Sequence, residues 1–315
     1  MRILPRMVNR VTLACLLILS ACAIPDPPVE SRFELIVLGA AQDGGLPHFG
    51  CEKSCCTAAR ASGRKLYPTS LGIHDKNSGA LLLIEATPAI EAQTALLQKW
   101  ANVRGKQRQV VDGVLLTHAH IGHYLGLAQF GREVAGSKSV PVWLTERFAG
   151  FLTAHGPWKQ LIQLKQLELN VVQLNQLFEP LPGLRVEAIR VPHRDEFSDT
   201  VAFRIHGPNR SVLYVPDIDH LRDPQLISSL FDGIDLAFVD GTFYDGRELP
   251  GRIMSEVPHP PIVESMRDFE AAGIPAEIHF IHLNHTNPLL HDAKLRAEVE
   301  ARGFGIAKRG DIVAL

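Results

Sequence analysis

The sequence predicts one layered α/β domain, running from about Phe33 to Leu315, and three observations carry this prediction. Short apolar runs rich in β-branched residues recur along the chain, bounded by Gly, Pro, Asp or Asn. Helical patterns stand between several of these runs. No linker, repeat or low-complexity stretch interrupts residues 33–315, and a chain of 315 residues with 46% hydrophobic content can bury a sizeable core.

The predicted strands are almost continuously apolar, which indicates strands buried on both faces. In chain order they occupy 33–40, 80–86, 111–117, 140–145, 200–206, 211–216, 234–240 and 276–283. Helical patterns occupy 87–103, 126–136, 261–273 and 290–303, and the last three end at or near glycines. Thr87 can cap the first of these helices, and Pro88 suits its first turn, where no backbone donor is needed.

Residues 1–21 have the layout of a bacterial secretory signal peptide. Three arginines precede an apolar stretch that is too short to span a bilayer comfortably, with an uncleaved anchor as the alternative. The stretch ends in LSAC, which resembles the lipobox and implies cleavage before Cys22 and lipidation of that cysteine. The Pro-rich residues 22–32 would then tether the domain to a membrane, and Ala23 favours the periplasmic face of the outer membrane in a Gram-negative cell.

The charge balance gives no support for a nucleic-acid partner. The chain has 32 Lys and Arg against 34 Asp and Glu, a formal net charge of -2, and its only local excess of charge lies at the N-terminus. We therefore expect a small-molecule substrate, with a membrane contacted through the lipid anchor. Nothing in the sequence indicates an oligomeric state.

Three cysteines remain in the predicted domain, and they form one cluster, CEKSCC. Cys51, Cys55 and Cys56 could hold a structural zinc ion with His48, which precedes the first of them by three residues. A disulfide with one thiol left over is the alternative in an oxidising compartment, although adjacent cysteines are poorly placed to bridge each other. Three free thiols are the remaining possibility.

Three histidines follow the apolar run at 111–117 within six positions. His118 and His120 are two apart, so both point to the same side of an extended segment. Thr117 could cap a helix that starts just after it and brings His123 toward the same space. Neutral imidazoles converging at a strand end favour zinc.

These histidines resemble the fingerprint of the metallo-β-lactamase superfamily, His-x-His-x-Asp-His, read here as HAHIGH. More narrowly, AQDGGLPHFGCEKSCC, THAHIGHYLGL, VPHRDEFSDTVAFRI, YVPDID, DGTFYDG and HLNHTNPLL are similar to the family of coenzyme pyrroloquinoline quinone synthesis protein B, over nearly all of residues 33–315. The resemblance implies a single four-layer αββα sandwich. It also implies one or two metal ions, held at a first site by His118, His120 and His193 and at a second by His123 and His282, with Asp217 between them.

The sequence departs from the fingerprint at Gly122, where the superfamily has an aspartate. Without that carboxylate, the second site should bind its metal more weakly. Further polar residues at strand ends and in nearby loops could surround the ligands and orient them. These candidates are Asp43, Asp240, Thr242, His259 and His285.

Together these features predict a metal-dependent hydrolase, most simply a zinc enzyme. A zinc ion with an open coordination position activates water for attack on an ester, lactone, amide or phosphoester, and Asp217 would position that water and take its proton. The same ligands could hold iron for an oxidation related to quinone cofactor synthesis. A lipid-anchored protein that binds a metal or ligand without catalysis is the third hypothesis.

Overall fold

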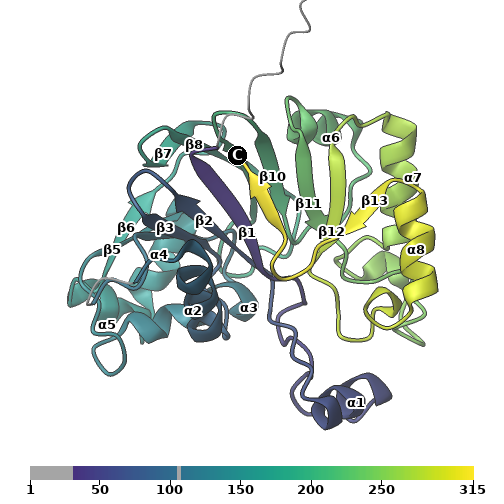
Figure 1. The fold of residues 1–315 in the computed structure, drawn as a ribbon, viewed down its shortest axis with the longest axis horizontal. Helices are drawn as coiled ribbons and strands as arrows, with labels where there is room; N and C mark the ends of the chain where they lie inside the picture. Colours follow the sequence, from purple (N-terminus) through teal and green to yellow (C-terminus); the bar gives the residue numbers. More distant parts are fainter. Residues whose placement is uncertain (1–30, 105–107) are drawn as a thin grey trace, which may run out of the picture. The chain divides into compact units, whose positions relative to one another are not determined.

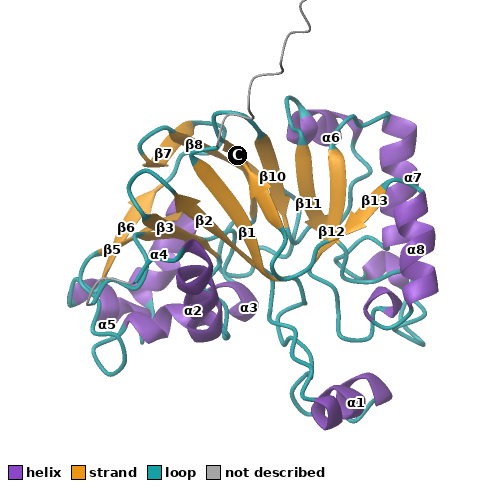
Figure 2. Ribbon diagram, viewed as in Figure 1, coloured by secondary structure: helices purple, strands orange, loops and turns teal. Residues whose placement is uncertain are grey.

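The computed structural model describes residues 31–104 and 108–315. Two seven-stranded mixed sheets pack face to face, and helices cover the outer face of each sheet (Figures 1 and 2). This arrangement confirms the predicted four-layer αββα sandwich. The predicted signal peptide, the lipidation site Cys22 and the tether as far as residue 30 lie outside the described residues.

The first sheet combines the N-terminal strands with one strand from the C-terminus. Its order is β14-β1-β2-β3-β4-β5-β6. Pairing is antiparallel from β14 to β3 and parallel from β3 to β6. The strands are β1 (Phe33–Gly39), β2 (Ser70–Asp75), β3 (Ala80–Ile84), β4 (Gly113–Leu115), β5 (Val140–Leu144), β6 (Leu167–Val171) and β14 (Ile312–Ala314).

The second sheet has the order β13-β12-β11-β10-β9-β8-β7. Pairing is antiparallel from β7 to β10 and parallel from β10 to β13. The strands are β7 (Leu177–Leu181), β8 (Leu184–Arg190), β9 (Val201–His206), β10 (Ser211–Val215), β11 (Leu236–Asp240), β12 (Glu277–Ile281) and β13 (Phe304–Ile306). Because β10, β11 and β12 run parallel, their carboxyl ends share one edge of the sheet.

Helices α2, α4 and α5 pack on the first sheet, and α6, α7 and α8 pack on the second. Helix α1 stands apart from both sheets on an excursion of the chain (Figure 1). The helices are α1 (Ser54–Ser62), α2 (Ile90–Ala101), α3 (Ile121–Tyr124), α4 (Glu146–Ala154), α5 (Trp158–Gln163), α6 (Pro224–Phe231), α7 (Ile262–Ala272) and α8 (Ala293–Ala301). Short 3-10 helices are η1 (Leu125–Phe130), η2 (Met254–Glu256) and η3 (Pro288–Leu290).

The main core lies between the two sheets. Side chains that alternate along each strand meet there, among them the buried Phe33, Phe203, Tyr214 and Phe238. Each outer face forms a second apolar layer against its helices. This explains why the strands read as continuous apolar runs, since both faces of each sheet are covered.

Each of the eight predicted strands is present, but the helix predicted at 126–136 is wrong. A 3-10 helix spans Leu125–Phe130 and turns follow it, because Gly126 packs directly against the backbone of residues 86 and 87 and donates its N–H to the carbonyl of Ala86, 2.8 Å away. The first helix starts at Ile90, and Thr87 accepts an N–H from Ala89 just before it.

The periodicity missed the strands β2, β6, β7, β8, β13 and β14 and the helices α1, α4, α5 and α6, which are short or mixed in polarity. None of the helices in the described ranges combines the length and the apolar character needed to cross a bilayer.

Candidate metal centre

Histidine and aspartate side chains from both sheets meet at one end of the sandwich. Each follows the carboxyl end of a strand, where a loop begins on a rigid support. The residues are Asp43 after β1, His118, His120 and His123 after β4, His193 after β8, Asp217 after β10 and His282 after β12. The fold therefore gathers all six predicted ligands.

The first group consists of His118, His120, His193 and Asp217, whose candidate ligand atoms all lie within 4.8 Å of one another. His118 Nε2 lies 2.8 Å from His120 Nδ1 and 3.1 Å from Asp217 Oδ2. His193 Nε2 approaches the same carboxylate oxygen to 3.6 Å. Three imidazoles and one carboxylate thus face a common point.

The second group contains His123, His282 and Asp43, again with all candidate ligand atoms within 4.8 Å. Asp43 Oδ1 lies 3.3 Å from His123 Nε2 and 3.5 Å from His282 Nε2. Asp217 lies between the two groups, with Oδ2 3.4 Å from His123 Nε2 and Oδ1 3.1 Å from His282 Nδ1. Asp43, expected only to surround the ligands, therefore stands among them.

Unpartnered polar atoms show that this cluster fits a metal ion. His193 Nε2, His123 Nε2 and Asp217 Oδ1 are buried and form no hydrogen bond within the described part of the chain. Buried polar atoms are almost always paired, so three exceptions in one place call for a partner. Imidazole nitrogens and a carboxylate suit zinc or iron.

Burial and charge oppose each other at Asp217. Burial would raise the pKa of this carboxyl, but the imidazoles of His282 and His123 attract its negative charge and hold the pKa well below its usual range. Burial, together with the charge of His123, lowers the pKa of His118 well below its ordinary value. An ionised carboxylate and a neutral imidazole are the forms that bind a metal.

The outward nitrogens of the histidines are held by a second set of residues. His118 Nδ1 lies 2.9 Å from Thr117 Oγ1, which donates to Glu85 Oε1 at 2.6 Å. His193 Nδ1 lies 3.0 Å from Asp219 Oδ1. Thr117 is therefore no helix cap, because its hydroxyl is engaged by Glu85. Such contacts fix the ring orientation of metal-binding histidines.

Two residues beside the centre have left-handed backbones. Glu85 follows β3 at φ 71° and His282 follows β12 at φ 64°. A left-handed backbone is strained for residues other than glycine, and strained residues cluster at functional sites. Glu85 was not singled out in the sequence. It is the one charged residue near the end of the apolar run ALLLIEA, and Asp217 has a similar place at the end of SVLYVPD.

His259, Asp240 and Thr242 form a buried network behind the second group. Asp240 Oδ2 lies 2.7 Å from His259 Nδ1, and Thr242 Oγ1 donates to Asp240 Oδ1 at 2.7 Å. His282 Nδ1 reaches Thr242 Oγ1 at 2.9 Å. Burial alone would lower the pKa of His259, but Asp240 raises it to about 9. The predicted surrounding residues Asp240, Thr242 and His259 therefore support His282 directly or through one contact.

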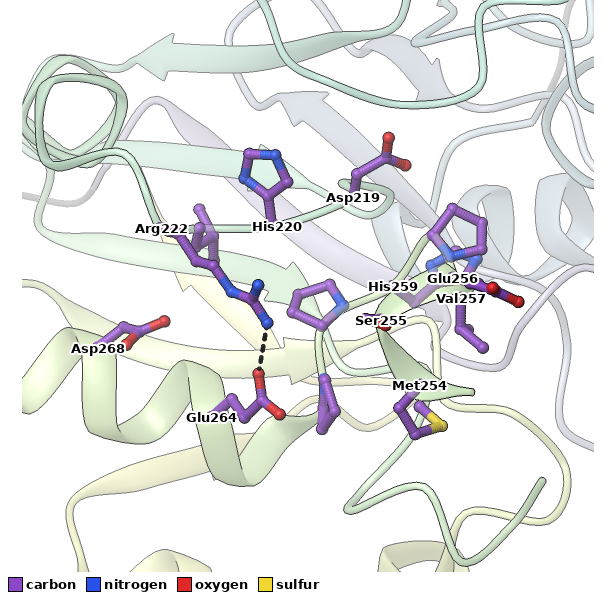
Figure 3. Close-up of a pocket in the computed structure, with 14 residues that line it drawn as sticks. Asp219, His220, Arg222, Met254, Ser255, Glu256, Val257, His259, Glu264 and Asp268 are labelled. Carbon is purple, nitrogen blue, oxygen red and sulfur yellow. Dashed lines mark hydrogen bonds and ion pairs between the residues drawn. The ribbon is translucent and has the colours of Figure 1, made fainter. Parts of the chain in front are cut away.

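A pocket of about 280 Å³ lies beside this network. Its lining includes His259 and Asp219, the carboxylate that contacts His193 (Figure 3). The ion pair between Arg222 and Glu264, 3.1 Å apart, forms another part of its wall (Figure 3). A small molecule in this pocket would lie next to the residues that support the metal centre.

His285 lies at the cysteine cluster, which corrects its assignment to the surroundings of the main centre. Candidate ligand atoms of Cys51, Cys55, Cys56 and His285 all lie within 4.8 Å of one another. His48, the predicted fourth ligand, instead stacks on His285 with ring centroids 4.5 Å apart. The excursion returns beside the loop after β12, so the fourth candidate comes from a segment that sequence spacing cannot indicate.

The three cysteines are free thiols in this structure. The sulfur atoms of Cys55 and Cys56 lie 3.9 Å apart, far beyond a disulfide bond of about 2.05 Å. Burial raises the pKa of Cys56 to about 11, against the backbone N–H of His48, which lowers it.

Residues 81–283 match the family described as Beta-lactamase superfamily domain. The coenzyme PQQ synthesis protein B of Rhizobium meliloti is 28% identical over 312 residues, covering 90% of this chain and 99% of the relative. Its namesake from Methylobacterium sp. strain 4-46 is 26% identical over 302 residues, covering 88% and 98%.

Two solved structures share the fold. Zinc-bound PqqB from Methylobacterium extorquens has a TM-score of 0.76 at 23% identity, covering 90% of this chain and all of that one. A diphosphatase of the PhnP family has a TM-score of 0.65 at 21% identity, covering 89% and 96%. At these identities the likeness establishes the sandwich and leaves the reaction open.

Proposed function

This chain belongs to the β-lactamase superfamily domain family, and from that premise we propose that it is a metal-dependent hydrolase acting on a small molecule. The observation that carries the proposal is the convergence of His118, His120, His193 and Asp217. Two of the buried ligand atoms, His193 Nε2 and Asp217 Oδ1, form no hydrogen bond within the described residues. One solved structure with the same fold is zinc-bound and another is a diphosphatase, which supports a metal-dependent hydrolase.

The position of each residue in the cluster determines its proposed role. A zinc ion held by His118, His120 and His193 would supply Lewis acidity and a water molecule with a pKa near 7. Asp217 stands between both groups, so its carboxylate can hold the attacking water and accept its proton. Asp219 fixes the ring of His193 from outside the cluster.

A substrate panel tests the proposal. Purified protein loaded with zinc should hydrolyse at least one of a broad set of esters, lactones, amides and phosphodiesters. His118→Ala should reduce that rate by at least a thousandfold, because it removes a ligand from the first group. His155→Ala, at an exposed histidine on the far end of α4, is the matched control and should keep full activity. Full zinc occupancy with no turnover on any substrate would point to the non-catalytic binding protein.

An iron-dependent oxidation is the second candidate, because the curated relatives are coenzyme PQQ synthesis proteins. Imidazole and carboxylate ligands hold iron as well as zinc. Elemental analysis of protein from its native cells, with oxygen-consumption assays, separates the two. Iron as the main native metal, with oxygen uptake lost in His193→Ala, would favour the oxidation over hydrolysis.

We also propose a structural zinc ion at Cys51, Cys55, Cys56 and His285. Four ligands of this kind make a closed tetrahedral site, and the buried Nδ1 of His285 forms no hydrogen bond within the described ranges. Such an ion would fasten the excursion that carries α1 to the loop after β12. Cys51→Ser should lose one zinc ion per chain and His285→Ala should do the same. His48→Ala should lose none, and loss of zinc in that variant would restore His48 as the ligand.

We propose export and lipid anchoring through Cys22, on the sequence of the first 22 residues alone. Expressed in a Gram-negative host, the full chain should fractionate with membranes. Cys22→Ser should move the protein out of the membrane fraction, whereas Cys15→Ser, a cysteine inside the predicted signal peptide, should not. Membrane association that survives in Cys22→Ser would indicate an uncleaved anchor instead.

A further inference from the structure

The position of Asp43 bears directly on the missing acid of the fingerprint. A Cβ atom built on Gly122 would lie 2.5 Å from Asp43 Cγ, 2.8 Å from its Cα and closer still to Oδ1. Real Cβ atoms essentially never come so near. The Asp43 side chain therefore occupies the space in which a side chain at position 122 would begin.

We propose that Asp43 supplies the carboxylate ligand of the second metal ion, in place of the aspartate that Gly122 replaces. This inference rests on the proposed metal centre and adds an assignment to it. Asp43 Oδ1 lies 3.3 Å from His123 Nε2 and 3.5 Å from His282 Nε2, so one ion between these three atoms would receive two imidazoles and a carboxylate. Asp217 Oδ2 approaches His123 Nε2 to 3.4 Å from the side of the first group, whereas Asp217 Oδ1 faces the other ring nitrogen of His282, Nδ1, at 3.1 Å.

The backbone around Asp43 is held in register with His282. The N–H of Gln42 donates to the carbonyl of Leu283 at 2.9 Å, and the N–H of Leu283 donates to the carbonyl of Ala40 at 2.9 Å. The residues on either side of these bonds are Asp43 and His282, which therefore lie next to each other. Contacts between backbones of two strand ends are a rigid way to place a ligand.

A tight turn that contains Asp43 keeps the carboxylate directed at the histidines. Gly45 donates its N–H to the carbonyl of Gln42 at 2.7 Å and has a φ of 65°, a conformation that glycine adopts without strain. The chain then leaves toward the cysteine cluster. The sequence AQDGG thus contains both Asp43 and the turn that directs its carboxylate toward the histidines.

The geometry also explains why position 122 is glycine. Any side chain there would displace Asp43, because its Cβ would meet the Asp43 side chain and Cα. Positions 43 and 122 are therefore alternative sources of a single carboxylate. The expectation that Gly122 weakens the second site for lack of an acid is revised accordingly, since the acid comes from the loop after β1.

The second group has one open side. The Asp43 side chain is 37% exposed, whereas those of His123 and His282 are fully buried. Asp43 and Gly122 line a groove of about 660 Å³, together with Tyr67, Pro88 and Ile121. The carboxylate therefore separates this groove from the buried imidazoles.

Counting metal ions tests the inference. The full-length protein, saturated with zinc and freed of loosely bound ions, should lose one ion per chain in Asp43→Ala and keep the ions of the first group and the cysteine cluster. Glu298→Ala, at an exposed acid on α8, is the control and should keep the wild-type count. Gly122→Ala should also lose one ion, because its methyl group displaces the carboxylate.

Cobalt substitution gives a readout that does not depend on activity. Cobalt bound by thiolates has intense sulfur charge-transfer absorption, which should persist in Asp43→Ala, while the weaker absorption from the histidine sites should fall. Asp43→Asn should show the same loss as Asp43→Ala, because the amide keeps the shape of the side chain without its negative charge.

The outcomes separate this inference from the proposed function. An Asp43→Ala protein with the wild-type metal count would overturn the inference and leave the hydrolase proposal standing. So would a wild-type protein with a single ion in its histidine cluster. The wild-type protein could bind its full set of ions and lose one in Asp43→Ala, yet turn over no substrate. That result would support the inference and contradict the hydrolase proposal.

Discussion

Glu85 is the residue that links the ligand histidines to the body of the first sheet. Its side chain is fully buried. One carboxylate oxygen, Oε1, accepts a hydrogen bond from the Thr117 hydroxyl and lies 3.3 Å from His123 Nδ1. Thr117 in turn holds His118. The Glu85 carboxylate thus orients one candidate ligand of each group. Glu85 is held in a left-handed backbone conformation, of the kind that clusters at functional sites.

Glu85→Gln should weaken zinc binding by about 10- to 100-fold, a typical loss when a residue that orients a metal ligand is changed. The amide keeps the shape of the side chain but loses the negative charge that faces His123. Competition titration against a chromogenic chelator measures the affinity. Glu91→Gln, at an exposed acid on α2, should bind as wild type, and equal affinity in both variants would remove Glu85 from this role.

At the scale of elements, Arg32 and Asp75 clamp the start of β1 to the end of β2. Both carboxylate oxygens of Asp75 accept from the Arg32 guanidinium at 2.9 Å, and Ser78 donates to the same carboxylate at 2.7 Å. The Asp75 side chain is only 1% exposed. The pair lies where Phe33 pairs with Asp75, so it fixes the register of β1 against β2.

The clamp should make stability depend on acid pH. The hydrogen bonds from Arg32, opposed by burial, lower the pKa of Asp75 to about 2. A lowered pKa in the folded state stabilises above the unfolded value of about 3.9, and this stabilisation disappears as the pH falls toward 2.

Asp75→Asn should therefore lower the free energy of unfolding by about 1 to 2 kcal/mol at pH 7. The difference from wild type should shrink between pH 5 and pH 2, as followed by urea unfolding. Glu34→Gln, which breaks the more exposed Lys76 pair of 3.1 Å, should change stability by less than about 0.5 kcal/mol at any pH. A constant difference for Asp75→Asn would contradict the assignment.

For the whole molecule, the metal centre joins the two sheets. His118, His120 and His123 follow a strand of the first sheet, whereas His193, Asp217 and His282 follow strands of the second. Ions bound by both sets would cross-link the halves of the sandwich. Metal binding to the folded state alone then adds to the free energy of unfolding.

Chelation should therefore lower the melting temperature by roughly 10 °C if the ion concentration is about a thousandfold above Kd. Calorimetry before and after dialysis against a chelator measures the shift, and added zinc should reverse it. The effect should persist in Cys51→Ser, where the cysteine cluster no longer contributes. A melting temperature unaffected by chelator would mean that the histidine cluster binds no ion in the folded protein.

Several of the candidate ligands could be proposed from the sequence because they follow an apolar run directly. His118, Asp217 and His282 each follow a predicted strand closely, which indicates a polar group at the end of a sheet. His193 came from the family resemblance. Glu85 was missed and Asp43 was assigned only to the surroundings of the ligands, because the positions of both depend on neighbours far along the chain. Asp43 matters through Gly122, and Glu85 matters through Thr117 and His123.

Local pattern determined a layered α/β domain, eight of its strands and the histidines that follow β4, because hydrophobic periodicity and strand-end polarity are properties of neighbouring residues. The family resemblance supplied the four-layer sandwich and the remaining candidate ligands. Only the packing of distant loops places Asp43 beside His123 and His282 and places His285 beside the three cysteines. The backbone bonds between residues 40, 42 and 283 bring Asp43 to His282, and the excursion brings His285 to the thiols. Such pairings depend on how loops close in space, which spacing along the chain does not encode.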